Sequence, residues 1–373
     1  MRKALVIGGG IAGLSSAISL RQGGWSVDVV EINRTRDVYH VGIIVQSNFL
    51  RALDRLGVAE EAIARGYPYA GFDLCALDGS LDAYIPGVEL SRKGHPTDLG
   101  LTRPALHDIL MGAATKWDVT PRYNVTFNKI EQVGDKVNLS FTDGTNDCYD
   151  MVVGADGLYS KTRTTVFDAA LLPQYTGQAV WRYNLPRPAD VVRTALFQGA
   201  SGGKAGYCPL NDDTMYLLLV MREPGNPWIP RNQLAAAFTD RLKQFGGRIA
   251  HIRDTVEFDP DKIVYRPLEA ILVPAPWYRG GVLLIGDAAH GTTPHLGQGA
   301  AQAVEDAVVL GAIAAGDLAV ADIVRQFMER RYARCKLIWE SSLQIGRWEI
   351  DDDPDADVPA ISRAVLQSLS QDI

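Results

Sequence analysis

The sequence predicts an α/β fold in which a dinucleotide-binding domain is interleaved with a β-sheet-rich domain. The chain opens on an apolar strand that runs directly into G-x-G-x-x-G at Gly8, Gly10 and Gly13. A second apolar strand, 282–285, ends in Gly-Asp far along the chain. Short runs of alternating apolar residues between these two motifs predict the β-rich part. Two such motifs, so distant in sequence, indicate one extended cofactor held from both ends.

The first motif is followed by an amphipathic helix and a second strand at 27–31. Gly8 is expected to make the tight turn and Gly10 to let the backbone approach a pyrophosphate. Gly13 is expected to let the helix pack closely on the sheet. An unrelated glycine-rich turn is the alternative, and the strand before and helix after the glycines argue against it.

The helix that begins at Ile11 and Ala12 is expected to direct its N-terminus at the phosphates of the dinucleotide. Glu31, which closes the second strand just before Ile32, stands about 20 positions after the glycines. An acidic residue at that spacing typically bonds a ribose hydroxyl.

Asp156 belongs to a second motif, in which an apolar strand ends in Gly-Ala-Asp-Gly, and Ser160 and Arg163 follow in the next helix. A cofactor role for Asp156 and a purely structural role as a helix cap are both open from the sequence.

The third motif begins at Gly286 and Asp287 and continues through Pro294 and His295 into a helix. An aspartate at a strand end suits hydroxyl binding, and a glycine-rich loop at a helix N-terminus suits an anion or a carbonyl. The glycine-rich loop is made by Gly297, Gln298, Gly299 and Ala300.

The remaining segments alternate between helical and strand patterns. A helix at 104–116 is expected to have Thr102 as its N-cap and Pro104 in its first turn. Hairpin turns are expected at 133–136 and 142–145. The other expected helices are 47–56, 59–66, 230–252, 299–314, 318–345 and 359–369, and the expected strand regions are 68–86, 119–154 and 177–220.

Composition bounds the function. The 373 residues carry a formal net charge of −7, which argues against nucleic acid or an anionic membrane surface as a partner. The four cysteines are scattered, which favours reduced thiols and a cytoplasmic location. No segment has 18 consecutive apolar residues, and no metal site or membrane partner is expected.

Together the three motifs resemble the group A flavin-dependent monooxygenases, the aromatic hydroxylases of the para-hydroxybenzoate hydroxylase fold. The resemblance covers residues 3–345 and implies an FAD-binding, Rossmann-like domain of the glutathione-reductase type, with C-terminal helices. It implies FAD as the cofactor and assigns the glycine turn to the pyrophosphate and Glu31 to the adenosine ribose. The segment 39–44 departs from the family at His40 and Ile43.

The resemblance also assigns residues around the flavin. Arg103 matches an arginine that lies over the FAD, and Asp156 matches a motif that serves FAD and the nicotinamide donor. Asp287 matches the residue that binds ribityl or ribose hydroxyls. Pro294 and the segment 297–300 match the border of the isoalloxazine ring.

The implied domain organisation is discontinuous. The FAD-binding domain is expected to comprise 1–67, 97–175 and 276–345, the substrate domain 68–96 and 176–275, and a helical tail 346–373.

The chemistry implied by the resemblance is aromatic hydroxylation. NADH or NADPH reduces the flavin, O2 adds to give a C4a-hydroperoxide, and the distal oxygen passes to a small aromatic or N-heteroaromatic substrate. The sequence has no second dinucleotide fingerprint, so the nicotinamide donor lacks a Rossmann module of its own. It also has no paired cysteines after the first helix, no R-x-G-G-R and no W-x-W-x-I-P, which argues against disulfide reductases, amine oxidases and flavin halogenases respectively. A same-fold epoxidase or alkene reductase and a non-catalytic flavin-binding protein stay open as alternatives. A homodimer is possible.

Residues for substrate binding are sought on the β-rich part. Strand alternation sends Trp181 and Tyr183 to one face and Arg182 to the other, and either face could look at the flavin. Arg182 would pair a carboxylate or a phenolate. Tyr207 and Tyr216 are further candidates. His295 could assist deprotonation of a substrate hydroxyl, or could simply pack beside the flavin.

Overall fold

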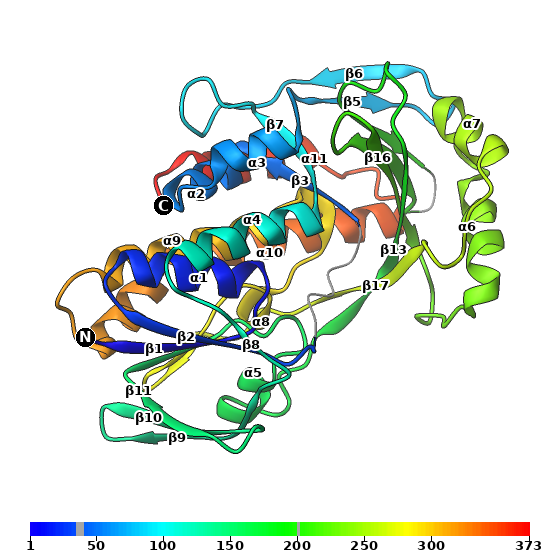
Figure 1. Ribbon diagram of the computed structural model, residues 1–373. Helices are drawn as coiled ribbons and strands as arrows, with labels where there is room; N and C mark the ends of the chain where they lie inside the picture. Colours follow the sequence, from blue (N-terminus) through cyan, green and yellow to red (C-terminus); the bar gives the residue numbers. More distant parts are fainter. Residues whose placement is uncertain (35–40, 200–201) are drawn as a thin grey trace.

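A computed structural model describes residues 1–34, 41–199 and 202–373. Two large β-sheets organise the chain, one beneath a layer of helices that includes α1 and α9, the other at the far side of the molecule (Figure 1). The predicted α/β class with an interleaved β-rich part is confirmed. His40 lies outside the described residues.

The first sheet has six strands in the order β18-β19-β12-β1-β2-β8. Its central strands β19, β12, β1 and β2 pair in parallel. Parallel neighbours have their carboxyl ends at one edge, so the three motifs that follow β1, β12 and β19 meet there. The strands are Lys3–Ile7 (β1), Ser26–Glu31 (β2), Arg122–Tyr123 (β8), Met151–Gly154 (β12), Tyr278–Arg279 (β18) and Val282–Leu284 (β19).

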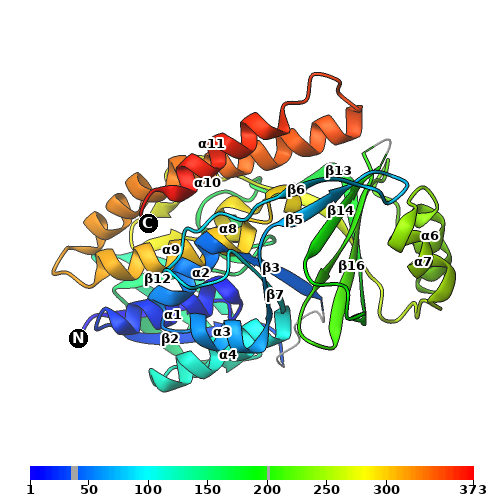
Figure 2. The same cartoon turned by 90° about the horizontal axis from the view of Figure 1, so that it is seen from above.

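Helices flank this sheet, and α1 packs along α9 over its whole length (Figures 1 and 2). The predicted cap of α4 is confirmed, because the Thr102 hydroxyl accepts a hydrogen bond from Ala105 N at 3.2 Å. The helices are Ile11–Gln22 (α1), Ser47–Arg55 (α2), Ala59–Arg65 (α3), Arg103–Lys116 (α4), Lys161–Val166 (α5), Asp287–His290 (α8), Pro294–Leu296 (η2, a 3₁₀ turn) and Gly299–Ala314 (α9).

Two small antiparallel sheets complete this part of the molecule. One has the order β11-β10-β9 and uses both predicted hairpin turns. The other has the order β3-β7-β4 and connects the first large sheet to the second. The strands are Gly42–Gln46 (β3), Tyr67–Tyr69 (β4), Asp98–Thr102 (β7), Phe127–Val133 (β9), Lys136–Phe141 (β10) and Asn146–Tyr149 (β11).

The second large sheet has seven strands in the order β17-β13-β16-β15-β14-β5-β6. It is antiparallel apart from the β14–β5 pair. The strands are Phe72–Cys75 (β5), Leu81–Ile85 (β6), Gln174–Pro186 (β13), Thr194–Gln198 (β14), Lys204–Pro209 (β15), Thr214–Arg222 (β16) and Val264–Ala270 (β17).

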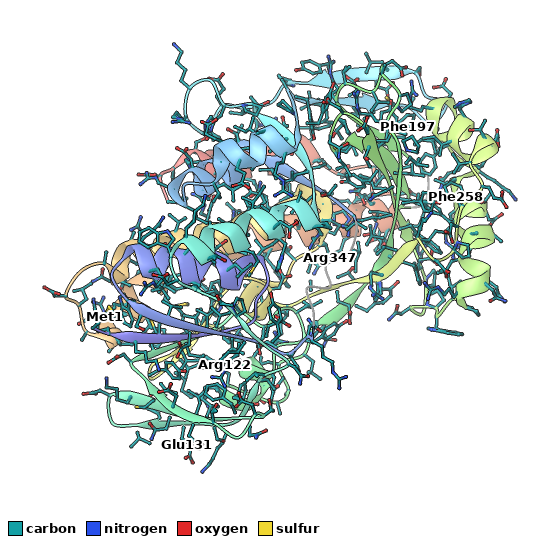
Figure 3. The ribbon with its side chains drawn as sticks, in the orientation of Figure 1. Met1, Arg122, Glu131, Phe197, Phe258 and Arg347 are labelled. Carbon is teal, nitrogen blue, oxygen red and sulfur yellow. The ribbon has the colours of Figure 1, made fainter. Side chains whose placement is uncertain are left out.

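The two faces of this sheet have different neighbours. Trp181 and Tyr183 point to the outer face, where they pack with Phe238 and Phe258 beneath the helices Leu234–Leu242 (α6) and Gly247–Thr255 (α7). Figure 3 labels Phe197 and Phe258 in this layer, and a 3₁₀ turn, Arg231–Gln233 (η1), precedes α6. The opposite face looks toward the part of the molecule built on the first large sheet (Figure 1), called the FAD-type domain below because the sequence predicts FAD binding there, and the side chains on this face come from the even-numbered residues of β13.

The chain ends in a long helix, Val320–Asp351 (α10), and a final helix, Val358–Ser370 (α11). We expected α10 to end near residue 345, but it continues for six more residues. Residues 346–351 keep one face packed on the second large sheet and on the loop 291–298, called the flavin loop below because the sequence predicts that it borders the flavin. Within the described residues, no helix is long and apolar enough to cross a membrane.

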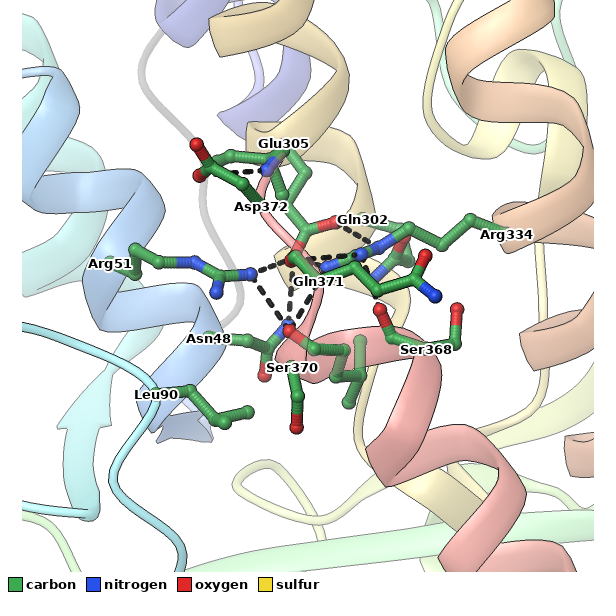
Figure 4. Close-up of polar contacts among 12 residues, drawn as sticks. Asn48, Arg51, Leu90, Gln302, Glu305, Arg334, Ser368, Ser370, Gln371 and Asp372 are labelled. Atoms are coloured by element: carbon green, nitrogen blue, oxygen red, sulfur yellow. Dashed lines mark hydrogen bonds and ion pairs between the residues drawn. The ribbon is translucent and has the colours of Figure 1, made fainter.

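Helix α11 is fixed at its C-terminal end by two arginines, of which Arg334 is buried and Arg51 half-buried. Arg334 donates to Ser368 O at 2.6 Å, and Arg51 donates to Leu369 O at 2.9 Å (Figure 4). Both arginines lie beside Glu305, which is fully buried in α9. Cations at a helix C-terminus satisfy its free carbonyls and oppose the helix dipole.

Candidate active site

The glycine turn after β1 has the geometry that its spacing predicts. Gly8 has a φ of +110°, and a Cβ there would lie 2.4 Å from Ala155 O. A Cβ on Gly13 would lie 1.9 Å from Gly8 O, so only glycine lets α1 start this close to the strand. A Cβ on Gly10 would meet no atom within 4 Å. The turn therefore leaves open space at Gly10, where a pyrophosphate is expected, while the other two glycines are required by the fold.

Glu31 lies beside this turn at the end of β2. Its Oε2 accepts from Gly9 N at 2.7 Å, and its Oε1 accepts from Asn33 N at 2.9 Å. His107, a buried residue of α4, contacts Gly9 O through Nε2 at 3.0 Å and fixes the turn from the other side. Ile32, the next residue, is 65% exposed, and a single exposed apolar side chain is ordinary on a protein surface.

Asp287 begins α8 at the same edge of the sheet. A Cβ on Gly286, the residue before it, would lie 3.0 Å from the Cβ of Ala12, so the first and third motifs touch. The Asp287 side chain is exposed, and within the described residues it has no hydrogen bond or ion pair. Its carboxylate is therefore available for ligand hydroxyls.

The carboxylate of Asp156, by contrast, is already used. It accepts from the Ser160 hydroxyl and, at 2.8 and 2.9 Å, from the backbone N and hydroxyl of Thr162. Buried Arg163 donates to Leu158 O, Leu171 O and Ala288 O and so ties this motif to α8. The structure favours the cap interpretation of Asp156 over a direct cofactor contact.

The loop before α9 is held rigidly. Gly297 has a φ of +66°, and Gln298 is buried with its amide bonded to Gln46, Asn48 and Gln302. Gly299 and Ala300 form the first turn of α9, and the N-cap Gln298 makes no side-chain cap bond. The free N–H groups of that turn thus stay available for a carbonyl or an anion.

Arg182 lies on the inner face of β13, the face directed at the FAD-type domain. Burial and then the neighbouring Arg103 lower the pKa of Arg182 to about 10. Within the described residues, the Arg182 guanidinium has no hydrogen bond or ion pair, and Arg103 Nε is buried without a partner. Two cations without an anion between them indicate a place for a negatively polarised ligand.

Tyr216 shares this inner face. A Cβ on Gly42 would lie 2.2 Å from the Tyr216 ring, so β3 of the FAD-type domain touches the tyrosine directly. Burial raises the pKa of Tyr216, and its hydroxyl stays protonated at neutral pH. Ile43, one of the departures from the family, is buried in β3.

The structure does not bring Tyr207 to the site. Tyr207 pairs with Leu217 across β15 and β16, and its ring packs on the outer face against Phe197 and below Arg248 of α7. Cys208, the next residue, pairs with Tyr216. Since side chains alternate along a strand, only one of the two predicted tyrosines can face the flavin domain.

Pro294 begins the η2 turn, and His295 is engaged on both sides of its ring. Its Nδ1 lies 2.9 Å from the Thr293 hydroxyl, and its Nε2 lies 3.1 Å from Glu349 Oε2 in α10. Burial and then Lys204 lower the pKa of His295, so the ring is neutral near pH 7. These contacts favour the packing role of His295 over proton abstraction.

Sequence reasoning missed the polar cluster around His295. Lys204 donates to Glu349 Oε1 at 2.6 Å, and Gln178 Nε2 lies 3.2 Å from Glu349 Oε2. Although burial raises it, Lys204 and His295 lower the pKa of Glu349 to about 2. The early end expected for α10 placed Glu349 outside the domain, which is why the cluster was not anticipated. His107 was also missed, and only its place in the Arg103 helix could have indicated it.

A second buried cluster lies under α8. Candidate ligand atoms of His290, Asp306 and Cys335 lie within 4.8 Å of one another. Arg331 Nε donates to Asp306 Oδ1 at 2.7 Å, and His290 Nε2 lies 2.7 Å from Asp306 Oδ2. Although burial raises it, His290 and Arg331 lower the pKa of Asp306 to about 2. The guanidinium of Arg331 supplies the positive charge that a metal ion would otherwise provide to these groups, so the cluster is an internal ion-pair network.

The residues at the sheet edge fit FAD. The space at Gly10, the unpaired carboxylate of Asp287 and the free N–H groups at α9 provide for a pyrophosphate, hydroxyls and a ring carbonyl respectively. They come from the first and third of the sequence motifs.

Comparisons with known proteins agree with this geometry. The FAD binding domain family matches residues 1–336. The chain is 32% identical to 2-heptyl-3-hydroxy-4(1H)-quinolone synthase of Pseudomonas aeruginosa, over 92% of this chain and 90% of that protein. It is 27% identical to 6-hydroxynicotinate 3-monooxygenase of Bordetella bronchiseptica, over 82% of this chain and 80% of that protein.

Among solved structures, Klebsiella pneumoniae HpxO in complex with FAD and uric acid has the same fold. Its TM-score is 0.84 at 24% identity, with 100% of this chain and 93% of the other covered.

Proposed function

The chain belongs to the FAD binding domain family, as a group A flavin-dependent monooxygenase, and from this we propose that it uses NADH or NADPH and O2 to hydroxylate a small aromatic or N-heteroaromatic compound. FAD is its cofactor. The observation that carries the substrate side of the proposal is Arg182, a half-buried guanidinium without a hydrogen-bond or ion-pair partner among the described residues, beside Arg103.

The bound FAD supplies the oxidation chemistry, and the protein's own residues bind, orient and enclose the substrate. Arg182 pairs a carboxylate or phenolate oxygen, which orients the ring relative to Pro294. Tyr216, protonated and buried, offers a neutral donor on the same face. The apolar residues Ile44 and Leu218 pack beside Tyr216 and help to keep water out of the site.

The relatives support an aromatic nitrogen heterocycle. A quinolone and a hydroxynicotinate are named in two of them, at 32% and 27% identity. We therefore extend to this chain the class of compound, a hydroxylated ring with a polarised oxygen, and no particular member of that class.

The test begins with a screen of phenols, hydroxypyridines and hydroxyquinolines for stimulated NAD(P)H oxidation by the FAD-loaded protein, with product analysis. Stimulation together with a product heavier by one oxygen atom is the expected result. An epoxide as the product would contradict hydroxylation and support the epoxidase alternative. If FAD binds and no aromatic compound accelerates NAD(P)H consumption, the non-catalytic alternative holds.

The role of Arg182 is tested with the substrate found. Arg182→Met should leave FAD content intact and raise the KM by roughly tenfold or more, because a charged hydrogen bond contributes about 1.5–3 kcal/mol. It should also divert NAD(P)H oxidation toward hydrogen peroxide. Arg222→Met changes an exposed arginine of the adjacent strand β16 and serves as the control. Equal KM and coupling in the wild type and Arg182→Met would remove Arg182 from the site.

A further inference from the structure

We propose that a second compartment beside the flavin loop binds the apolar substituent of the substrate, and that Gln178 Oε1 accepts a hydrogen bond from an N–H or O–H of the same molecule. The inference rests on the proposed function and names a narrower substrate class, a hydrogen-bond-donating aromatic ring with an apolar side chain. The compartment is a cavity of about 540 Å³ between β13, the segment after β17 and α10.

The walls of the cavity are mainly apolar. They come from four segments that are far apart in sequence, and three of these supply the aliphatic residues Leu171, Leu172, Ile271, Leu272, Pro274 and Leu343. Pockets for small molecules typically have about 300–1,000 Å³ and such walls, with a few polar groups that fix orientation. The volume is large enough for a ligand and not only for water.

Gln178 is the polar group that points to a ligand. It lines the cavity, its side chain is fully buried, and within the described residues Oε1 has no hydrogen-bond partner. Its Nε2 lies 3.1 Å from Gly202 O and 3.2 Å from Glu349 Oε2. Both neighbours are acceptors, so the amide orientation is fixed and the free atom is the oxygen. A buried acceptor without a partner is costly, and a ligand donor would remove that cost.

The cavity shares a wall with the flavin loop. Thr293 and His295 line it, and Pro294 stands between them. On the β13 side, Val180 separates Gln178 from Arg182 on one face of the strand, and Val180 packs with Val220 and Leu268. Four residues of strand span about 13 Å, so the polar end at Arg182 and the cavity lie within reach of one elongated molecule.

A neighbouring hollow indicates where a ligand can enter the cavity. A second hollow of about 410 Å³ on α10 shares Trp339, Leu343 and the exposed Arg347 with the cavity (Figure 3 labels Arg347). An apolar chain can therefore enter past Arg347 and Leu343.

The test measures dissociation constants of 4-ethyl-, 4-butyl- and 4-heptylphenol by equilibrium dialysis against FAD-loaded protein. In the wild type the affinity should rise by up to about fourfold per added methylene, the value for full burial of a CH₂. Leu343→Trp fills the cavity and should flatten this dependence while FAD content is retained. Ala333→Trp adds the same side chain at an exposed position of α10 and should keep the wild-type dependence.

The hydrogen bond is tested with N-hexyl-4-hydroxybenzamide and hexyl 4-hydroxybenzoate, which both keep the phenolic oxygen for Arg182 and differ in one N–H donor between the ring and the chain. The wild type should prefer the amide to the ester by about fivefold, the value of one neutral hydrogen bond. Gln178→Met should lose this preference and keep the dependence on chain length. Affinities that do not rise with chain length, or that rise equally in Leu343→Trp, overturn the cavity assignment, and a preference retained in Gln178→Met overturns the role of Gln178.

These binding measurements do not depend on turnover. Chain-length dependence without any stimulated NAD(P)H oxidation would contradict the proposed function and keep the cavity. Hydroxylation of aromatic compounds without chain-length dependence would support the proposed function and contradict the cavity assignment.

Discussion

Two aspartates at strand ends of one sheet show how local contacts decide a residue's role. Asp156 and Asp287 follow β12 and β19, which are adjacent parallel strands. The carboxylate of Asp156 accepts three hydrogen bonds from the start of α5, whereas the carboxylate of Asp287 has none within the described residues. The first is committed to the fold, and the second is available to the cofactor.

The difference predicts opposite outcomes for the two alanine variants. Asp287→Ala should weaken FAD binding by roughly 10-fold to 150-fold, the range of one charged hydrogen bond, with an unchanged Tm of the apoprotein. Asp156→Ala should lower the apoprotein Tm, since loss of a helix cap costs about 1 kcal/mol. Flavin fluorescence titration and thermal melts measure the two quantities. A lower apoprotein Tm with normal FAD affinity in Asp287→Ala would make Asp287 a cap as well.

Glu349 gives the molecule a pH dependence of known sign. Its pKa is lowered from 4.5 to about 2 by Lys204 and His295, against the effect of burial. A lowered folded-state pKa adds stability above the unfolded value, and that stability is lost as the pH falls from about 4.5 to about 2. The Tm of the wild type should therefore exceed that of Glu349→Gln at pH 6, and the gap should close below pH 3.

The control for this measurement is Glu340→Gln, which removes an exposed carboxylate of the same helix whose ion-pair partner within the described residues is Lys336. An exposed pair of this kind contributes little, so its Tm should follow the wild type at every pH. A gap between wild type and Glu349→Gln that persists unchanged to pH 2 would contradict the ion-pair assignment.

At the scale of elements, the strand–turn–helix unit of β1 and α1 separates folding from binding. A side chain at Gly13 collides with backbone, whereas a side chain at Gly10 meets empty space. The same substitution should therefore have different effects at two positions three residues apart.

Gly10→Ala should yield a folded, colourless protein with the wild-type apoprotein Tm, because its methyl group would occupy only the expected pyrophosphate position. Gly13→Ala should lower the apoprotein Tm strongly or abolish folding, because Gly8 O cannot move without displacing the strand. Circular dichroism melts and the absorbance at the flavin band distinguish the two. A yellow Gly10→Ala protein with normal FAD content would show that the phosphates lie elsewhere.

At the scale of the whole molecule, the cofactor is expected to join segments from the beginning, middle and end of the chain. The purified protein should be yellow and should release FAD, not FMN, on denaturation, because the Gly8–Gly13 turn and Glu31 serve the adenosine half. Added FAD should raise the Tm of the apoprotein, by an amount that corresponds to about 2.7 kcal/mol at 100 times the Kd. Chromatography of the supernatant and melts at several FAD concentrations measure both. FMN in the supernatant would contradict the assignment.

Much of this architecture could be predicted because it follows local rules. The glycine turn, the Thr102 cap and the two hairpin turns each depend on a few adjacent residues, and all appear as expected. The inner and outer faces of β13 could not be assigned, because alternation gives two faces and only the packing of α6 and α7 selects between them. Gln178 and Glu349 belong to no motif, and they meet only through tertiary contacts.

Arg182 and Arg103 place two positive charges together in a protein whose net charge is −7. Two like charges beside low-dielectric protein concentrate the field, so we expect a negatively charged substrate to be drawn toward them although the net charge of the protein repels it. Association with an anionic substrate should consequently slow as ionic strength rises, whereas an uncharged analogue of the same shape should bind at a rate that salt hardly alters. We therefore expect charged and uncharged ring compounds to be distinguished by their association rates as well as by their affinities.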